Sequence, residues 1–418
     1  MLKIKKAVTN FYEHEFNRNF LKLLSGGALS AVITIIAIPI TTRLYSPEQF
    51  GMFQLFSSII IVLSSISSFK YEMAIVLPRT VIRSKALVQL SLITLLATTL
   101  VYCFIFAFFG EALLSWLSAE SLIPYMILFP FSIFIAGLFQ VVQYMVINKK
   151  EYADLSKNKV IQTSLNQTGA ISSGLTGGTT VGLLISFTAA QLLATFLLLR
   201  KHNVKINVRG TKHFRLLAIR YKKFPLINMV STFLNTLSMQ LPVFMLGKFA
   251  SAEAVGIYML ANRLLEMPLS LLNGPATQVY IKTAADKYHD GVSELKKLYL
   301  SLLKKLSFIG LLAVVAVFAF SDIAVTAFLG DEWAEVALFM CVLIVGKFFQ
   351  FINAPLSSTL MIINRQELGM LMIIVSLAFR YWSMYFVSFD VLYMMYALTV
   401  SSSLFYGIYN ITMYKAIK

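Results

Sequence analysis

The sequence predicts an all-α polytopic membrane protein with about twelve transmembrane helices in two six-helix halves. Three observations lead to this prediction. The 418-residue chain is 58% hydrophobic and only 13% charged, whereas soluble domains are roughly 45–50% apolar and about 25% charged. Apolar runs of membrane-crossing length follow one another from end to end. A short motif beside the first run recurs about half a chain later.

A helix needs about 20 apolar residues to cross the roughly 30 Å hydrocarbon core of a bilayer. Twelve stretches are predicted to do so, near residues 20–43, 51–77, 86–109, 122–147, 157–176, 179–199, 225–247, 255–280, 300–328, 333–362, 367–388 and 391–414. The fifth is the most polar, with Gln162, Asn166 and Gln167. A polar span of this kind is expected to face protein or water and not lipid.

The distribution of basic residues predicts the orientation. With both chain ends in the cytoplasm, 30 of the 36 Lys and Arg fall in cytoplasmic segments, and only Arg43 and Lys248 fall in outer loops. This bias is the one that orients membrane proteins, and it accounts for the formal charge of +17 without a nucleic-acid partner. The longest polar segment is basic and lies near the midpoint. We therefore predict an N-terminal lobe at 1–199, a cytoplasmic linker at 200–223 and a C-terminal lobe at 224–418.

The residues that usually carry enzyme or metal chemistry are sparse. Cys103 and Cys341 each lie within an apolar run, which favours buried thiols over a disulfide or a metal site. The sequence has no DxD motif and no histidine cluster, and its predicted outer loops are short. We expect no enzymatic activity, no metal and no cofactor.

An internal repeat relates the two halves. Residues 43–55 (RLYSPEQFGMFQL) align without a gap to residues 248–260 (KFASAEAVGIYML), at an offset of 205. Six spans in each half give both halves the same orientation, as in parallel repeats. The matched Ser46 and Ser251 are predicted to cap helix starts. The matched Gly51 and Gly256 are predicted to let helix backbones approach closely.

Four segments resemble a known family: TRLYSPEQFG at 42–51, YEMAIVLPR at 71–79, VGIYMLANRLLEMP at 255–268 and FLGDEW at 328–333. They resemble the Wzx-type polysaccharide flippases, the O-antigen and capsule transporters of the multidrug/oligosaccharidyl-lipid/polysaccharide (MOP) exporter superfamily. The resemblance implies a MATE-like fold of two lobes around a central cavity, in the bacterial cytoplasmic (inner) membrane. It implies a substrate, an oligosaccharide on undecaprenyl pyrophosphate, and partners that polymerise the glycan and set its chain length.

Charges within the predicted spans mark a candidate site, because each is costly in the bilayer and usually faces a cavity or a partner. Arginine and lysine can replace the hydration of a pyrophosphate. The candidate substrate-binding cations are Arg263, Lys347, Lys70, Arg43 and Arg380, and the candidate charge partners or coupling groups are Glu72, Glu266 and Lys248.

Structural roles for these charges stay open. Arg263 and Glu266 are about one helical turn apart, so they share a helix face and could pair with each other. Lys70 and Arg380 could extend to the membrane interface, and Arg43 and Lys248 could anchor outer turns.

Polar and aromatic side chains in the spans are candidates for sugar contacts, with helix–helix hydrogen bonding as the alternative. The candidates are Gln54, Gln143, Asn166, Tyr258 and Asn353.

The leading hypothesis is a flippase that moves lipid-linked oligosaccharide to the outer leaflet by alternating access. A cation-coupled multidrug exporter of the same fold is the first alternative. A membrane polysaccharide polymerase or glycosyltransferase is an alternative of a different class. The positive balance of the intramembrane charges favours an anionic substrate.

Overall fold

The computed structural model of the protein describes residues 25–78, 80–202, 214–363 and 365–417. These residues form helices joined by short connections, without a strand among them. The predicted cytoplasmic N-terminus before residue 20 and residues 203–213 of the predicted linker lie outside the described residues.

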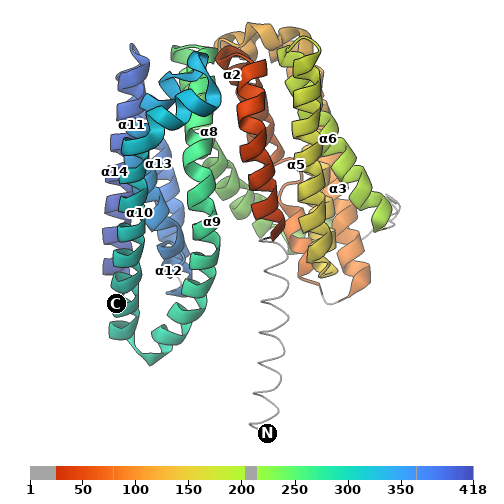
Figure 1. The fold of residues 1–418 in the computed structure, drawn as a ribbon. Helices are drawn as coiled ribbons and strands as arrows, with labels where there is room; N and C mark the ends of the chain where they lie inside the picture. Colours follow the sequence, from red (N-terminus) through yellow and green to blue (C-terminus); the bar gives the residue numbers. More distant parts are fainter. Residues whose placement is uncertain (1–24, 79, 203–213, 364, 418) are drawn as a thin grey trace. The chain divides into compact units, whose positions relative to one another are not determined.

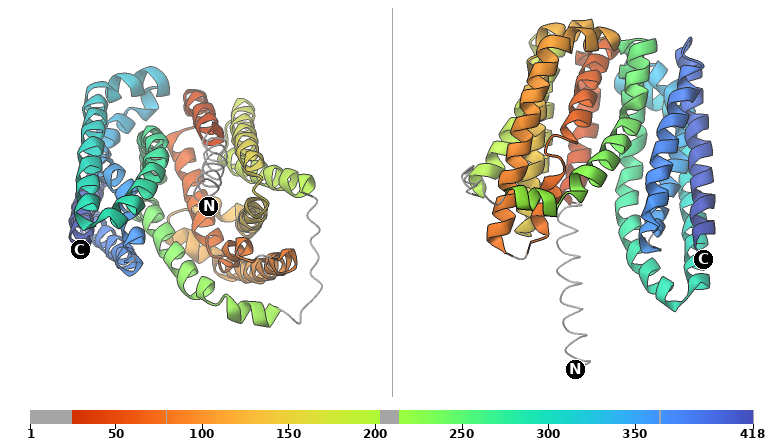
Figure 2. Two further views of the ribbon diagram at one scale, coloured as in Figure 1. Left: turned by 90° about the horizontal axis from the view of Figure 1, so that it is seen from below. Right: turned by 180° about the vertical axis from the view of Figure 1, so that it is seen from behind.

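The helices follow the predicted order of spans (Figures 1 and 2). The first runs from Ser25 to Leu44. The others are α2 (Pro47–Ser64), η1 (Tyr71–Val76), α3 (Val81–Trp116), η2 (Glu120–Tyr125), α4 (Leu128–Asn148), α5 (Tyr152–Leu175), α6 (Thr180–Lys201), α7 (Phe214–Arg220), η4 (Phe224–Asn228), α8 (Met229–Phe249), α9 (Ala252–Asp290), α10 (Val292–Leu329), η5 (Asp331–Trp333), α11 (Glu335–Leu356), α12 (Thr359–Ile362), α13 (Gln366–Tyr385) and α14 (Val391–Ala416).

Every predicted span overlaps a helix, and nine helices of the described chain are long and apolar enough to cross a membrane. The protein is therefore a multi-pass membrane protein. The remaining three spans correspond to the less apolar α2, α5 and α9. In α5, Gln162 contacts Gln191 of α6, in agreement with the prediction that this span faces protein, and Asn158 Nδ2 donates to the Ala194 carbonyl at 2.7 Å.

The prediction of one continuous helix over 51–77 is wrong. Helix α2 ends at Ser64, residues 65–70 form turns, and the short helix η1 begins at Tyr71. A serine-rich sequence causes the break, because serine hydroxyls compete for backbone carbonyls. Ser65 Oγ donates to Val62 O at 2.7 Å, and Ser67 Oγ donates to Ser64 O at 2.9 Å.

The chain forms two compact units. Unit 1 comprises the described residues of Met1–Tyr45, Ile59–Ala112 and Leu122–Phe233, and unit 2 comprises Ser46–Ser58, Leu113–Ser121 and the described residues of Leu234–Lys418. Within unit 1, α6 packs against α4 and α5. Within unit 2, α11 packs against α9, α10 and α14, and α13 packs against α14.

The two repeat-equivalent glycines contact each other's helices in unit 2. A Cβ added to Gly51 of α2 would lie 1.6 Å from the Ala252 carbonyl oxygen, and one added to Gly256 of α9 would lie 1.9 Å from the Pro47 carbonyl oxygen. Beside them, the Phe50 ring meets Trp333 edge-on, with ring centroids 5.3 Å apart. The predicted close approach of helix backbones is confirmed.

The predicted helix starts are also confirmed. Helix α9 begins after Ser251, whose Oγ accepts a hydrogen bond from Ala254 N at 3.1 Å. Helix α2 begins after Ser46, whose Oγ accepts from Gln49 N at 3.3 Å while Gln49 Oε1 accepts from Ser46 N at 3.0 Å. This reciprocal pair is a capping box. It fixes the start of α2 next to Gly51.

Gly51→Ala and Gly256→Ala should each destabilise the protein by about 3 kcal/mol or more, because the new methyl group must force two helix backbones apart. Gly407→Ala in α14 is the matched control, since no atom lies within 4 Å of its added Cβ. Thermal unfolding in detergent measures the effect. Equal midpoints for Gly51→Ala and Gly407→Ala would contradict the proposed close contact.

Candidate functional site

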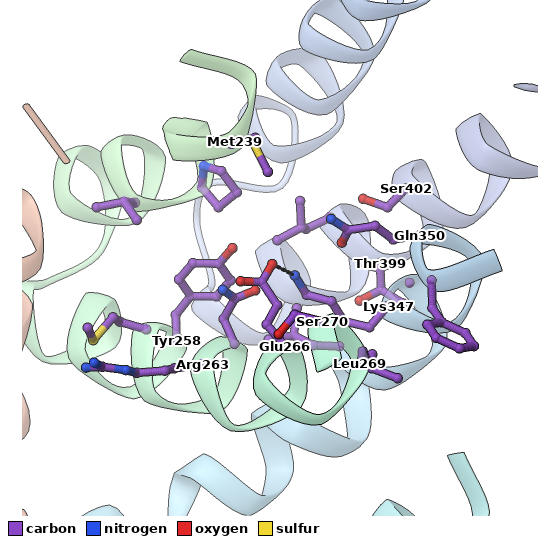
Figure 3. Close-up of a pocket in the computed structure, with 18 of the residues that line it drawn as sticks. Met239, Tyr258, Arg263, Glu266, Leu269, Ser270, Lys347, Gln350, Thr399 and Ser402 are labelled. Carbon is purple, nitrogen blue, oxygen red and sulfur yellow. Dashed lines mark hydrogen bonds and ion pairs between the residues drawn. The ribbon is translucent and has the colours of Figure 1, made fainter. Parts of the chain in front are cut away.

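A cavity of about 650 Å³ lies within unit 2 (Figure 3). Its walls come from α8, α9, α11, α13 and α14, and Gln54 of α2 also lines it. Six of the candidate residues named from the sequence line this one cavity: Gln54, Tyr258, Arg263, Glu266, Lys347 and Arg380.

The centre of the cavity wall holds an ion pair between α9 and α11. Lys347 Nζ lies 2.6 Å from Glu266 Oε1 (Figure 3). The Lys347 side chain is 13% exposed and the Glu266 side chain 44% exposed. The carboxylate is therefore open to the cavity, whereas the ammonium lies behind it. Glu266 pairs with Lys347. The alternative in which Glu266 pairs with Arg263 on the same helix face is therefore wrong.

Arg263 is the uncompensated cation of this wall. Its side chain lines the cavity and extends away from the Glu266–Lys347 pair (Figure 3). Among the described residues, no acidic side chain forms an ion pair with it. A half-buried guanidinium without a carboxylate partner is available to an anionic ligand.

Arg380 of α13 also lines the cavity and is 8% exposed. Its Nη1 donates to the Ser238 carbonyl at 3.3 Å and its Nη2 donates to the Tyr406 hydroxyl at 3.1 Å. Its Cζ also lies 5.7 Å from the centroid of the Tyr406 ring, a distance typical of cation–π contacts. The alternative in which Arg380 extends to the membrane interface is therefore wrong.

Uncharged polar groups complete the lining. Gln54 Nε2 donates to Ser58 Oγ at 3.0 Å, and Ser58 Oγ donates to Gln240 Oε1 at 2.7 Å. Several polar lining residues were not predicted from the sequence, among them Asn262, Asn273, Gln350 and Tyr406. Helical periodicity was the signal for two of them, because Tyr258, Asn262, Glu266 and Asn273 share one face of α9.

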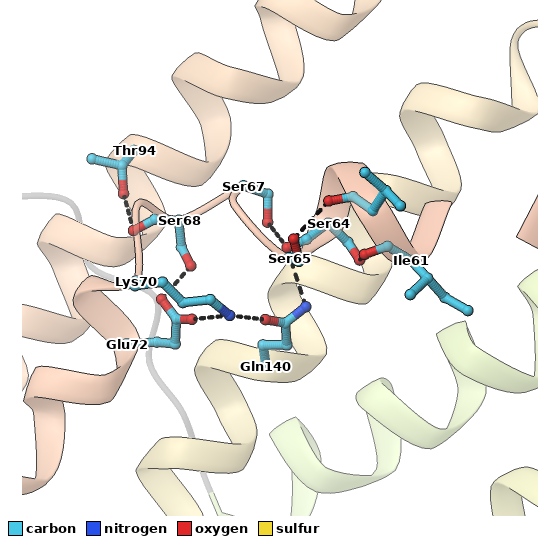
Figure 4. A network of polar contacts seen from close by, with 10 residues as sticks. Ile61, Ser64, Ser65, Ser67, Ser68, Lys70, Glu72, Thr94 and Gln140 are labelled. Carbon is cyan, nitrogen blue, oxygen red and sulfur yellow. Dashed lines mark hydrogen bonds and ion pairs between the residues drawn. The ribbon is translucent and has the colours of Figure 1, made fainter. Parts of the chain in front are cut away.

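Lys70 and Glu72 lie in unit 1, outside this cavity, in a buried polar network at the break after α2 (Figure 4). Lys70 Nζ lies 3.3 Å from Glu72 Oε1 and donates to Gln140 Oε1 at 3.2 Å. Ser68 Oγ donates to Glu72, and Gln140 Nε2 donates to the Ser64 carbonyl at 3.2 Å. Lys70 is 8% exposed, so it does not extend to an interface.

The other sequence candidates do not join the cavity. Arg43 is exposed, and Gln143 and Asn166 belong to unit 1. Lys248 Nζ lies 5.2 Å from the centroid of the Trp116 ring. Asn353 is buried behind the cavity lining, and its Oδ1 has no hydrogen-bond partner within the described residues.

The family model described as "Polysaccharide biosynthesis protein" matches residues 40–338. The chain belongs to this polysaccharide biosynthesis family. The match includes Arg263 and Glu266, whereas Lys347 and Arg380 follow it in the sequence.

A curated relative is the teichuronic acid biosynthesis protein TuaB of Bacillus subtilis (strain 168), 26% identical over 164 residues. The alignment covers 39% of this chain and 32% of the relative. The matched part therefore spans about a third of the length of TuaB.

Solved structures of MOP transporters share the fold of this polysaccharide biosynthesis protein. An inward-facing multidrug resistance MATE family transporter superposes with a TM-score of 0.75 at 16% identity, over 94% of this chain and 95% of that chain. The lipid II flippase MurJ, in an inward closed conformation, gives 0.72 at 12% identity, over 93% and 89%. A MOP superfamily transporter from Pyrococcus furiosus, described as having a binding pocket of reverse polarity, gives 0.56 at 14% identity over 96% of each chain. The predicted MATE-like fold is confirmed.

Lys70→Met should destabilise unit 1 by about 3–5 kcal/mol, because it leaves the fully buried Glu72 carboxylate without its ion partner. The double variant Lys70→Met/Glu72→Gln removes both charges and should recover most of the loss. Thermal unfolding of the purified single and double variants measures the difference. A double variant no more stable than Lys70→Met would show that the ion pair is not what Lys70 contributes.

Proposed function

We propose that the protein is a flippase for a lipid-linked oligosaccharide and that it binds the diphosphate head group in the cavity of unit 2. The charge of that cavity is the observation that carries the proposal. Its lining holds three cations, Arg263, Lys347 and Arg380, against one acid, Glu266. Fixed cations in a cavity lined by membrane-spanning helices favour an anionic ligand, because the cations replace the water that the ligand loses on binding.

The two accessible cations have different roles in this proposal. Arg263 has no competing carboxylate and makes the first contact with the diphosphate. Lys347 becomes available only after the anion displaces Glu266, because Glu266 Oε1 lies 2.6 Å from Lys347 Nζ. Arg380 is already fixed by Ser238 and Tyr406 and supplies a stationary positive field.

The size of the cavity fits a head group with its first sugars. Ligand pockets are about 300–1,000 Å³ in general, and this one is about 650 Å³. A polyprenyl chain is left in the bilayer. Amides and hydroxyls such as Gln54, Asn262 and Gln350 offer hydrogen bonds to sugar hydroxyls.

Alternating access then carries the head group across the membrane. We place both chain ends in the cytoplasm of a bacterial cell and the membrane as the cytoplasmic (inner) one. An inside-negative potential favours outward transfer of the anion by about 2.3 kcal/mol per charge per 100 mV. Chain-elongating enzymes that consume the exported unit are the natural partners, and the protein itself acts as a transporter and not as an enzyme.

A cation-coupled multidrug exporter is the second candidate, and the similarity to MATE transporters favours it. At 16% identity that similarity concerns the fold alone. A cationic drug would meet three cations and a carboxylate already bound to Lys347. The charge of the cavity therefore favours the flippase.

Arg263→Ala and Lys347→Ala should each abolish export of the lipid-linked glycan without lowering protein levels, because each removes a cation available to the diphosphate. Spheroplasts treated with a membrane-impermeant glycan-cleaving enzyme report on which face the glycan lies. In both variants the glycan should accumulate protected on the inner face. Normal export in both variants would overturn the assignment of the cavity, and exported but unjoined units would indicate a polymerase.

Glu266→Gln should bind inorganic pyrophosphate more tightly than the wild type, on the order of tenfold, because it frees Lys347 and removes a negative charge from the cavity. Isothermal titration calorimetry on the purified protein measures this. Glu367→Gln, at an exposed acid in the first turn of α13, is the control. An unchanged affinity in Glu266→Gln would show that the carboxylate does not guard Lys347.

A further inference from the structure

A second cluster of ionisable side chains lies in unit 1, away from the cavity, where the ends of the α5–α6 hairpin meet. Glu151 precedes α5, Asp154 lies in its first turn, and His202 follows the last residue of α6. One ligand atom from each of the three lies within 4.8 Å of the other two. This spacing allows a single ion to contact all three.

The histidine is the most informative member of the cluster. Its side chain is only 4% exposed. Nε2 lies 3.2 Å from Asp154 Oδ2, yet it has no hydrogen-bond partner within the described part of the chain. The carboxylate oxygen therefore lies near the nitrogen but off the direction of an N–H bond. A buried ring nitrogen left in this way is costly unless something else satisfies it.

Two ligand atoms of one metal ion also lie close together without a hydrogen bond between them. Tetrahedral bonds of about 2.0–2.2 Å to nitrogen and oxygen place neighbouring ligand atoms roughly 3.3–3.6 Å apart. The separation of 3.2 Å between Nε2 and Asp154 Oδ2 is close to the lower end of this range. Glu151 Oε2 lies 3.7 Å from the other ring nitrogen, His202 Nδ1. To share an ion bound at Nε2, Glu151 must turn toward that nitrogen, and its side chain is 49% exposed and has room to do so.

Asp154 already has a cation beside it. Lys201 Nζ lies 2.6 Å from Asp154 Oδ1, and its side chain is 56% exposed. The ammonium can therefore move into water when a cation of higher charge takes its place.

We propose that Glu151, Asp154 and His202 bind a divalent first-row transition metal ion, with Zn²⁺ as the best match. One imidazole and two carboxylates form a three-residue ligand set that Zn²⁺ accepts, with water in the fourth position. The bound ion joins the two ends of the hairpin that residues 152–201 form. It also sits at the point where the predicted cytoplasmic linker begins. This proposal is independent of the proposed transport function.

Titration of purified full-length protein with Zn²⁺ tests the site, using a protein without a polyhistidine tag. Calorimetry should show one Zn²⁺ per chain, and Co²⁺ absorption should report nitrogen and oxygen ligation. His202→Ala should lose this binding, whereas His289→Ala, at an exposed histidine outside the cluster, should retain it. Because His202 is buried, Glu151→Gln provides a second test at an exposed position and should weaken the binding.

Lys201→Met separates a metal site from a simple ion-pair cluster. If the metal displaces the lysine, removing the lysine takes away a competitor and should shift Zn²⁺ binding to lower concentrations. If the cluster is only an ion-pair network, Lys201→Met should bind no Zn²⁺ and should lower the thermal midpoint. That result would overturn the proposal, and so would equal Zn²⁺ binding by the wild type and His202→Ala.

Discussion

The closeness of two helix backbones at Gly51 and Gly256 is the constraint on which unit 2 depends. Each glycine faces a backbone carbonyl of the other helix at a distance that no side chain permits. The contact joins equivalent positions of an internal repeat, so each helix presents the same motif to its partner. Helix α9 also carries Tyr258 and Glu266, both within about three turns of this contact. The register fixed by the glycines therefore places one wall of the cavity.

In the cavity, the cost of removing three cations from water is offset by the groups that they contact. Three cations within membrane-spanning helices are costly unless each finds compensation, and the structure compensates each differently. Arg380 has a backbone carbonyl and an aromatic hydroxyl, and Lys347 has a carboxylate. Arg263 has no acidic partner among the described residues. Under the proposed function, the charge of Arg263 that no acid balances attracts the anionic head group.

Much of this architecture followed from the sequence because it depends on local pattern. Apolar run length located each of the long helices, and serine at two repeat positions located two helix starts. The break after α2 was missed because neither the length nor the hydropathy of a segment shows where serine hydroxyls bind backbone carbonyls in place of the helical amides. The pairing of Glu266 with Lys347 joins residues 81 positions apart, and sequence spacing indicated only the neighbour within one turn, Arg263. The cluster of Glu151, Asp154 and His202 was missed for the same reason, since the two ends of the hairpin are far apart in the sequence.

Helices α9 and α10 are longer than a bilayer is thick. They contain 39 and 38 residues and meet at Gly291. At 1.5 Å per residue each is about 57 Å long, whereas a bilayer with its head groups is about 40–45 Å thick. The end near Gly291 therefore projects into the aqueous phase as an antiparallel arm. Its ion pairs, Lys287 with Asp290 at 3.2 Å and Lys297 with Glu294 at 2.8 Å, would be among the first parts of unit 2 that a soluble protease or antibody meets.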